Sequence, residues 1–382
     1  MSREGWLHIL VDRGALRHNM SEFRRHLPTA VRLLAVVKSE AYGHGLISAA
    51  GAFLEGGADM LGVHSINEAA VLRAAGVAAP VLVLGPLDRD GAVQAARLGV
   101  EITVSSVSGA HAAAAAVSSG DRSVRVHLKV ETGVNRQGIV EKELDEVLDI
   151  FAGEKGLRLV GLSSHFADIE DTTDHSFARI QSARFENWKS SLVERGHRGL
   201  CVHMSCSAAA ILWPLSEVGL VRIGIAGYGV WPSRETLVSA RNRNAADLDL
   251  RPALSWRCRV SQVRMVPAGE TVGYGRQWKA PVKSRIAVLP VGYADGYPRG
   301  LSGRAHVLLG GCRAPVVGRI CMNLTMVDVT HIPDVESDDV AVLLGRQGEE
   351  YISVEDLDGW LGTIPYEVLV GPGASWTRKE VD

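Results

Sequence analysis

Short apolar runs alternate with amphipathic segments along the first 230 residues of the chain. The runs have the length of buried parallel strands, and the segments between them carry apolar residues at helical spacing. The eight expected strands are Arg32–Lys38, Met60–Ser65, Pro80–Gly85, Val100–Ser105, Val124–Glu131, Leu157–His165, Gly199–Ser205 and Leu220–Ala226. Eight β-then-α units in about 200 residues predict a (β/α)₈ barrel, that is, a TIM barrel. An open doubly wound sheet is disfavoured, because no G-x-G-x-x-G follows the first strand.

Six helices are expected between these strands, and several of them end in glycine, as helix C-termini often do. They are Leu46–Gly56, Ile66–Gly76, Ala92–Gly99, Ala110–Gly120, Leu144–Gly156 and His175–Gly196. Each would cover one part of the outside of the barrel.

The pattern changes after the eighth unit. Ser233–Pro252 is polar, which is typical of a connection between two domains. Beyond it the period becomes two, which predicts a mostly antiparallel β domain with one helix, Val354–Leu361. Its expected strands are Ala253–Val266, Arg285–Val291, Arg304–Leu309, Ala314–Arg319, Leu324–Val329 and Asp339–Leu344. We therefore assign the barrel to residues 12–240 and the β domain to 241–382, with a further strand-like run, Leu7–Val11, before the barrel.

Composition narrows the class of protein. The 382 residues are 46% apolar with a formal net charge of −2, which describes a globular protein with no electrostatic attraction for nucleic acid or membrane. The most apolar stretch, Gly45–Val63, is interrupted by Glu55 and does not suggest a membrane span. Five cysteines without C-x-x-C spacing indicate free thiols rather than disulfides or a metal site. Free thiols are typical of a reducing compartment, and the first residues lack the apolar core of a secretory signal, so we expect a cytoplasmic protein.

Ionisable residues gather at the predicted C-terminal ends of the barrel strands, where barrel enzymes carry their chemistry. Lys38 ends the first strand, and a desolvated lysine amine is a nucleophile able to form a Schiff base, although a lysine at a strand end is more often simply solvated. The fifth strand alternates strictly, which points His127, Lys129 and Glu131 into the lumen. Lys129 must then meet an anion or lose its charge.

Several segments resemble the alanine racemases, barrel enzymes that carry pyridoxal 5'-phosphate. They are VVKSEAYGHG from Val36, HLKVETGVNR from His127, SSHFAD from Ser163, VRIGIAGYG from Val221, GETVGYG from Gly269, VGYADGYPR from Val291 and VGRICMN from Val317. The resemblance runs from the N-terminus to about Val370 and touches both predicted domains. It implies a homodimer, a small amino-acid substrate, and an N-terminal strand (residues 1–11) that joins the C-terminal domain.

The resemblance also implies a role for individual residues. Lys38, holding the cofactor as a Schiff base, and Tyr274, entering from the partner subunit, would be the two bases that act on opposite faces of Cα, and His165 and Arg222 would form a line towards the Tyr274 phenol. The cofactor-binding residues would be Lys38, Tyr42, Ser207, Arg222, Gly224, Ile225 and Tyr366. Arg136, Met322 and Tyr293 would serve the substrate. Lys129 would carry a carbamate that holds Arg136; an ion pair with Glu131 is the alternative.

The implied function is interconversion of L- and D-alanine, supplying D-alanine. Arg222 disfavours the related decarboxylases, which have a carboxylate at that position. A non-catalytic pyridoxal-phosphate carrier would need neither Tyr274 nor a second domain, and a cofactor-free aldolase would need no phosphate-binding set. The family usually has Asp where this chain has Asn323, and commonly Asn where it has Cys206. These two departures leave open a racemase of another small amino acid, such as serine.

Overall fold

The computed structural model describes residues 5–118, 123–213, 219–242, 248–372 and 377–381. The chain divides into two compact units. The barrel unit comprises Ala15–Ala41 and Leu46–Arg251, and the β unit comprises Met1–Gly14, Tyr42–Gly45 and Pro252–Asp382. The division after Arg251 lies beyond the boundary at residue 240 expected from the sequence.

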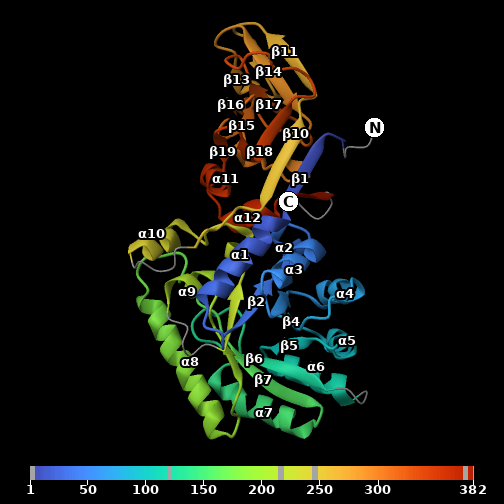
Figure 1. The fold of residues 1–382 in the computed structure, drawn as a ribbon, viewed down its shortest axis with the longest axis vertical. Helices are drawn as coiled ribbons and strands as arrows, with labels where there is room; N and C mark the ends of the chain where they lie inside the picture. Colours follow the sequence, from blue (N-terminus) through green and yellow to red (C-terminus); the bar gives the residue numbers. More distant parts are fainter. Residues whose placement is uncertain (1–4, 119–122, 214–218, 243–247, 373–376, 382) are drawn as a thin grey trace. The chain divides into compact units, whose positions relative to one another are not determined.

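The barrel unit holds eight parallel strands in the order β8-β7-β6-β5-β4-β3-β2-β9. Figure 1 labels β2 and β4 to β7 among them. They are β2 Arg32–Val36, β3 Met60–Val63, β4 Val81–Val83, β5 Glu101–Val104, β6 Val124–Lys129, β7 Leu157–Ser163, β8 Cys201–His203 and β9 Leu220–Ile223. Backbone hydrogen bonds from Gly219 N to Val202 O (3.0 Å) and from Arg222 N to Ser205 O (3.1 Å) join the two ends of this order. The predicted (β/α)₈ barrel is therefore confirmed, with every strand shorter than the apolar run that predicted it.

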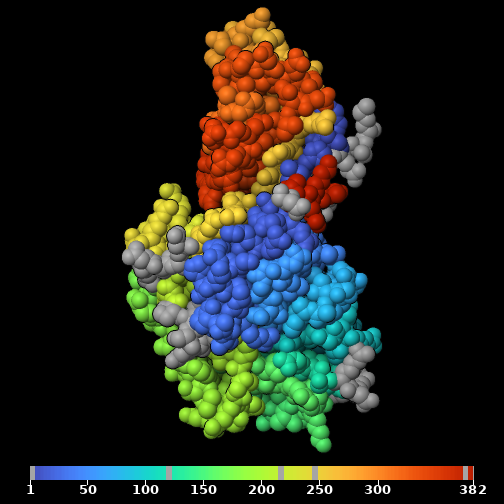
Figure 2. All heavy atoms as spheres, viewed as in Figure 1, coloured from blue at the N-terminus to red at the C-terminus, as the bar shows by residue number. Residues whose placement is uncertain are grey.

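Helices surround these strands. They are α1 Arg13–His26, α3 Leu46–Glu55, α4 Ile66–Ala74, α5 Arg89–Leu98, α6 Val107–Ser118, α7 Leu144–Gly153, α8 Ser176–Glu194, α9 Ser207–Leu212 and α10 Arg234–Asn242, with 3₁₀ turns at Glu141–Glu143 and Ile225–Tyr228. Side chains of α1 and of α3 to α6, blue to teal in Figure 2, lie next to one another over one side of the barrel unit. Helix α10 lies within the polar stretch expected to be a connection, and residues 243–247 of that stretch fall outside the described residues. Among the described helices, none has the length and apolar character needed to span a membrane.

The segment after Lys38 is left-handed. The short turn α2, Lys38–Tyr42, contains Ser39, Glu40, Ala41 and Tyr42, and all four have φ between 52° and 55°. Each such residue costs about 1–2 kcal/mol relative to a right-handed conformation. The Glu68 carboxylate accepts the Ser39 N–H at 2.6 Å and holds the first of these peptides. The two glycines that follow, Gly43 and Gly45, are thus preceded by a strained left-handed turn built from residues that carry side chains.

The β unit contains a seven-stranded sheet, in the order β16-β15-β18-β10-β1-β20 with β19 beside β18, a three-stranded sheet, β11-β14-β17, and the pair β12-β13. The strands are β1 Leu7–Asp12, β10 Leu254–Arg259, β11 Gln262–Val266, β12 Thr271–Val272, β13 Trp278–Lys279, β14 Ser284–Leu289, β15 His306–Leu309, β16 Cys312–Pro315, β17 Thr325–Asp328, β18 Val340–Gln347, β19 Glu350–Ile352 and β20 Arg378–Val381. Three further 3₁₀ turns (Tyr274–Arg276, Tyr293–Asp295 and Arg299–Leu301) and two helices, α11 Val354–Leu361 and α12 Pro365–Val370, complete the unit. Strand β1 pairs antiparallel with β10.

One strand prediction was wrong. Ala253–Val266 is not a single strand: it is β10 and β11, which belong to different sheets. The chain changes sheets at Val260 and Ser261, where Val260 N bonds to Asp339 O and Ser261 N bonds to Val288 O. The two adjacent peptides thus pair with different strands.

Replacing Gly161 by alanine is expected to destabilise the barrel unit. Gly161 of β7 lies opposite His127 of β6, and a Cβ at this position would overlap the His127 ring. That ring is buried and hydrogen-bonded on both sides, so it cannot move without breaking a bond. We expect the free energy of unfolding to fall by about 2–4 kcal/mol, measured by urea denaturation. Gly153→Ala, where the new Cβ meets nothing within 4 Å, is the control and should change stability by less than about 1 kcal/mol.

Candidate active site

Lys38 follows strand β2 at the C-terminal end of the barrel strands. Burial lowers the pKa of its amine below the usual value, the positive charge of Arg136 lowers it further, and Glu68 opposes both. A lysine with a lowered pKa holds more of its amine unprotonated near neutral pH, and the unprotonated amine is the nucleophile. The position and the electrostatics of Lys38 therefore suit covalent chemistry.

Lys129 ends strand β6, and it lines a small cleft together with Arg136 and His165. Burial lowers the pKa of Lys129 to about 8, helped by the charges of Arg222 and Arg136. The alternative considered from the sequence, an ion pair between Lys129 and Glu131, is not among the contacts of the described residues. The Glu131 carboxylate instead accepts the Gly133 N–H at 2.5 Å in the turn that follows the strand. Lys129 is left close to cations, with its amine partly unprotonated near neutral pH.

Arg222 of strand β9 is buried and makes hydrogen bonds with both ends of its guanidinium. Nη1 donates to His203 Nδ1 (2.7 Å) and His203 O (3.0 Å). Nη2 donates to Ser164 O (2.9 Å), Met204 O (3.2 Å) and His165 Nδ1 (3.3 Å). Burial lowers the pKa of Arg222 to about 10, so it remains a cation at neutral pH. All of these acceptors are carbonyl oxygens or imidazole nitrogens.

His165 follows strand β7, and its protonation follows from Arg222. Burial lowers the pKa of His165 well below its usual value, and the charge of Arg222 adds to this, so the ring is neutral. Because a guanidinium can only donate, Nδ1 of His165 must accept. The single ring proton is therefore on Nε2, which can donate to an oxygen within hydrogen-bond distance.

Ser207 and Gly224 form the third part of the site. Ser207 begins α9 after strand β8, and its Oγ accepts the N–H of Gly224 at 3.0 Å. Gly224 and Ile225 follow strand β9, and Ile225 is fully buried. A hydroxyl and backbone amides after the seventh and eighth strands of a barrel are the usual donors to a phosphate group.

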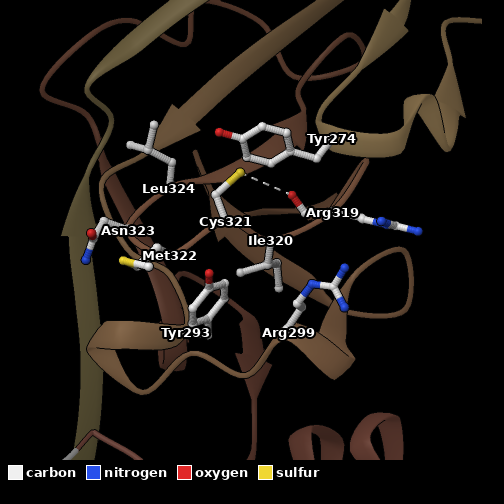
Figure 3. A pocket seen from close by; sticks show the side chains of 9 residues that line it. All are labelled: Tyr274, Tyr293, Arg299, Arg319, Ile320, Cys321, Met322, Asn323 and Leu324. Atoms are coloured by element: carbon white, nitrogen blue, oxygen red, sulfur yellow. Dashed lines mark hydrogen bonds between the residues drawn. The ribbon is translucent and has the colours of Figure 1, made fainter.

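The remaining candidates lie in the β unit. Tyr274, Tyr293 and Met322 line a cavity of about 550 Å³ together with Arg299, Arg319, Ile320, Cys321, Asn323 and Leu324 (Figure 3). Tyr274 and Tyr293 lie on opposite sides of the 320–322 segment, and the Tyr293 hydroxyl points towards this cavity. The Tyr274 side chain is 73% exposed and Met322 is 57% exposed. Large apolar side chains gathered at one exposed cavity are typical of a binding surface.

Asn323 has a defined partner in this cavity. Its Nδ2 donates to Asp295 Oδ2 at 3.2 Å, and the same oxygen accepts the Gly292 N–H at 2.9 Å. An aspartate at position 323 would bring a second carboxylate against Asp295. The amide of Asn323 therefore suits its neighbour Asp295.

Tyr42 and Tyr366 also lie in the β unit, with ring centroids 6.0 Å apart and planes tilted by 44°. The two expected phosphate-binding tyrosines are thus neighbours, although they are separated by more than 300 residues in the sequence. Next to Tyr42 along the chain, the carbonyl of Gly43 accepts from Arg378 Nε at 2.9 Å. The candidate residues as a whole divide between the two units: Lys38, Lys129, Arg136, His165, Ser207, Arg222, Gly224 and Ile225 in the barrel unit, and Tyr42, Tyr274, Tyr293, Met322 and Tyr366 in the β unit.

Comparison with known proteins identifies the family. A family model described as the alanine racemase N-terminal domain matches residues 11–232, and one described as the alanine racemase C-terminal domain matches residues 253–380. The chain belongs to the alanine racemase family. An alanine racemase of Desulfosudis oleivorans is 38% identical over 372 residues, which cover 94% of this chain and 92% of that protein. The protein is therefore an amino-acid racemase.

Solved structures of alanine racemases share the fold of this chain. The enzyme from Bacillus anthracis with bound L-Ala-P has a TM-score of 0.91 at 33% identity, covering 100% of this chain and 96% of that one. The enzyme from Streptomyces lavendulae has a TM-score of 0.92 at 32% identity, covering 99% and 97%. A histidine racemase from Leuconostoc mesenteroides also matches, with a TM-score of 0.86 at 25% identity, covering 100% and 99%. The same architecture is therefore shared by racemases named for different amino acids.

Two residues that hydrogen-bond directly to the segment after Lys38 or to Arg222 were missed in the sequence analysis. Glu68 accepts N–H groups from Ser39 (2.6 Å) and His64 (2.7 Å), and so supports the turn after Lys38. Its signal was the capping box Ser65-x-x-Glu68 at the start of α4. His203 supports Arg222, but it lies in a three-residue strand that is too short to show alternation. The sequence carried a signal for the first residue and none for the second.

Proposed function

We propose that this protein is a pyridoxal 5'-phosphate-dependent racemase that interconverts L- and D-alanine by a two-base mechanism. The observation that supports this best is the charge of the barrel site. Lys38, Lys129, Arg136 and Arg222 lie near one another, and the carboxylates that act on the two lysines are Glu68 and Glu131. Among the described residues neither carboxylate lies within ion-pair distance of these cations, so the four positive charges outnumber the negative ones. Such an excess of positive charge needs an anionic ligand.

The residues present fit pyridoxal phosphate. Ser207 Oγ and the amides of Gly224 and Ile225 would hold its phosphate, with the phenol groups of Tyr42 and Tyr366. Arg136 would face its phenolic oxygen, and Lys38 would hold it covalently. When bound, the cofactor would withdraw electrons from the substrate and so acidify the hydrogen on Cα.

Arg222 would set the type of reaction. A guanidinium that keeps its proton at neutral pH would face the pyridine nitrogen as a donor and keep that nitrogen unprotonated. The pyridine ring of the cofactor would then withdraw electrons only moderately. This favours loss and return of one proton over transamination or decarboxylation. A carboxylate at this position would have the opposite effect.

Two bases would move the proton. The Lys38 amine would take or return it on one face of Cα, and the Tyr274 oxygen would do so on the other. A tyrosine hydroxyl ordinarily titrates near pH 10 and needs help to act as a base. The Nε2–H of neutral His165, fixed by Arg222, would donate to the phenolate and stabilise it.

We further propose that Tyr274 acts in the site of a partner subunit. Its large exposure, and that of Met322 in the same cavity, supports an interface between two copies of the chain. The homodimer would contain two composite sites. The expected cytoplasmic location stays a prediction from the cysteine pattern.

A panel of amino acids tests the substrate. Arg136 and the backbone amide of Met322 would hold the substrate carboxylate, and we expect D-alanine to appear from L-alanine faster than D-serine from L-serine. Purified protein is incubated with single L-amino acids, histidine included, and D-forms are separated by chiral chromatography. A large preference for serine or histidine would overturn alanine as the substrate, and no product from any of them would overturn the proposed function.

Lys129 is expected to carry a carbamate. Its amine, with a pKa lowered to about 8, would add CO₂ and release one proton, which replaces a buried cation by an anion next to Arg136. Protein equilibrated with ¹³C-bicarbonate should show one carbamate ¹³C resonance, absent from Lys129→Ala and retained in Lys189→Ala, an exposed lysine on α8. A wild-type spectrum without this resonance would show that Lys129 is unmodified.

A further inference from the structure

A chain of four hydrogen-bonded side chains runs through the interior of the barrel from Arg222. Arg222 Nη1 lies 2.7 Å from His203 Nδ1, and His203 Nε2 lies 2.8 Å from His127 Nδ1. His127 Nε2 lies 2.6 Å from Glu101 Oε2. Glu101, at the start of strand β5, was not among the residues expected from the sequence to take part in the reaction.

The direction of every hydrogen bond in this chain is determined by its two ends. Arg222 can only donate, so His203 Nδ1 accepts. Burial and the charge of Arg222 lower the pKa of His203 well below its usual value, so the ring is neutral and its proton is on Nε2. That proton must be donated to His127 Nδ1.

The same reasoning extends to the carboxylate. Because His127 Nδ1 accepts, its proton is on Nε2 and is donated to Glu101 Oε2. If His127 were doubly protonated, its Nδ1–H would point at the Nε2–H of His203, and two donors would face each other. A carboxylate is the appropriate end of the chain, because it accepts and never donates when ionised. Burial would raise the pKa of Glu101, but the hydrogen bonds from His127 and Arg125, together with the charge of Arg125, lower it overall, so it is ionised at neutral pH.

We propose that Glu101 is a positioning residue of the racemase: through His127 and His203 it fixes the tautomers that let Arg222 donate in one orientation. The role of Arg222 in this inference rests on the proposed function, whereas the hydrogen-bond chain itself is independent of that function. Arg222 and Glu101 favour the same proton positions from opposite ends of the chain. Without an acceptor at position 101, the buried Nε2–H of His127 would be left unpaired, which favours moving that proton to Nδ1. His203 would then present its own proton to Arg222. The guanidinium would lose a hydrogen bond and the orientation that this bond sets.

The other contact of Glu101 provides a matched control. Its Oε1 accepts from Arg125 Nε at 2.8 Å, and the Arg125 side chain is half exposed. Glu101 itself is only 6% exposed, and His127 and His203 are 1% exposed. If Glu101 served only as the anion of a surface ion pair, Arg125→Ala would change the histidine tautomers and turnover at least as much as Glu101→Ala does. If it serves the interior chain, Arg125→Ala leaves that chain intact.

The test is ¹⁵N NMR of the full-length protein labelled at histidine, because protonated and unprotonated imidazole nitrogens have well separated shifts. In wild type we expect His127 and His203 to be protonated on Nε2 only, with each signal assigned by its loss in the His127→Gln or His203→Gln variant. In Glu101→Ala at least one of the two rings should show Nδ1 protonation. Glu101→Gln, which keeps an acceptor, and Arg125→Ala should both keep the wild-type tautomers.

Turnover is the second measurement. For Glu101→Ala we expect kcat for racemisation to fall about tenfold with KM little changed, and Arg125→Ala to stay near wild type. The proposal is overturned if either wild-type ring is protonated on Nδ1, a result that needs no variant to fold. It is also overturned if Glu101→Ala keeps both tautomers, or if Arg125→Ala changes them equally. Wild-type protein that racemises no amino acid would overturn the proposed function, and the NMR result would still test the chain from Glu101 to Arg222.

Discussion

Replacing Lys38 by alanine is expected to reduce racemisation by at least about 10³-fold in both directions, because one residue supplies both the covalent attachment and one of the two bases. Loss of the attachment alone would weaken binding of the cofactor. Loss of the base alone would stop proton transfer on one face of Cα. The lowered pKa of the amine indicates that it is available unprotonated near neutral pH. Polarimetry of L- and D-alanine measures the loss of racemisation, and deuterium uptake at Cα in D₂O measures the loss of proton transfer.

The attachment can be tested separately from the rate. Borohydride reduction followed by peptide mapping should find the cofactor mass on the peptide that contains Lys38, and on no other. Lys189→Ala removes an exposed lysine that pairs with Glu186, and it should match wild type in both assays. A small primary amine added to Lys38→Ala should restore part of the proton exchange. Racemisation within tenfold of wild type in Lys38→Ala would rule out the assigned role.

The barrel could be predicted from sequence because its strands are buried on both faces. Such strands read as apolar runs, and all eight lay within three residues of their observed bounds. The predicted strands extend beyond the observed ones for a physical reason. An apolar run shows where the chain is buried, and it does not show where the backbone leaves the sheet, as it does after Val36.

The left-handed turn after Lys38 could not be predicted. Positive φ is normally signalled by glycine or asparagine, and the four residues Ser39 to Tyr42 include neither. The break between β10 and β11 likewise has no glycine or proline at Val260 and Ser261. In both places the conformation is decided by distant partners, Glu68 in the first and Asp339 and Val288 in the second.

The site could be predicted in part. Lys129, His165 and Arg222 were expected together because the C-terminal ends of the barrel strands meet at one end, and in the structure their charges act on one another. Glu101 was missed because it lies at the N-terminal end of its strand, where barrel residues are taken to serve stability. The alternation of β6 pointed His127 into the lumen, but a sequence does not show which side chain of another strand it meets. The roles given to the individual residues stay predictions.

Tyr274→Phe is expected to separate the two faces of the reaction. The phenyl ring keeps the packing at the cavity and removes only the oxygen that would move the proton. Because the equilibrium constant between enantiomers is one, kcat/KM for racemisation must fall equally in both directions, by about 10²–10⁴-fold. A change in racemisation rate alone therefore does not reveal a one-sided loss.

Exchange of the Cα hydrogen with solvent does reveal it. The enantiomer whose hydrogen faces Lys38 should still take up deuterium from D₂O with retention of configuration, while the enantiomer whose hydrogen faces position 274 should take up almost none. Wild type should label both. Tyr351→Phe, which removes a hydroxyl elsewhere in the β unit beside Arg346, is the matched control and should also label both. Equal loss of exchange from both enantiomers in Tyr274→Phe would show that the tyrosine does not act on one face, and the two-base mechanism would then need a different second base.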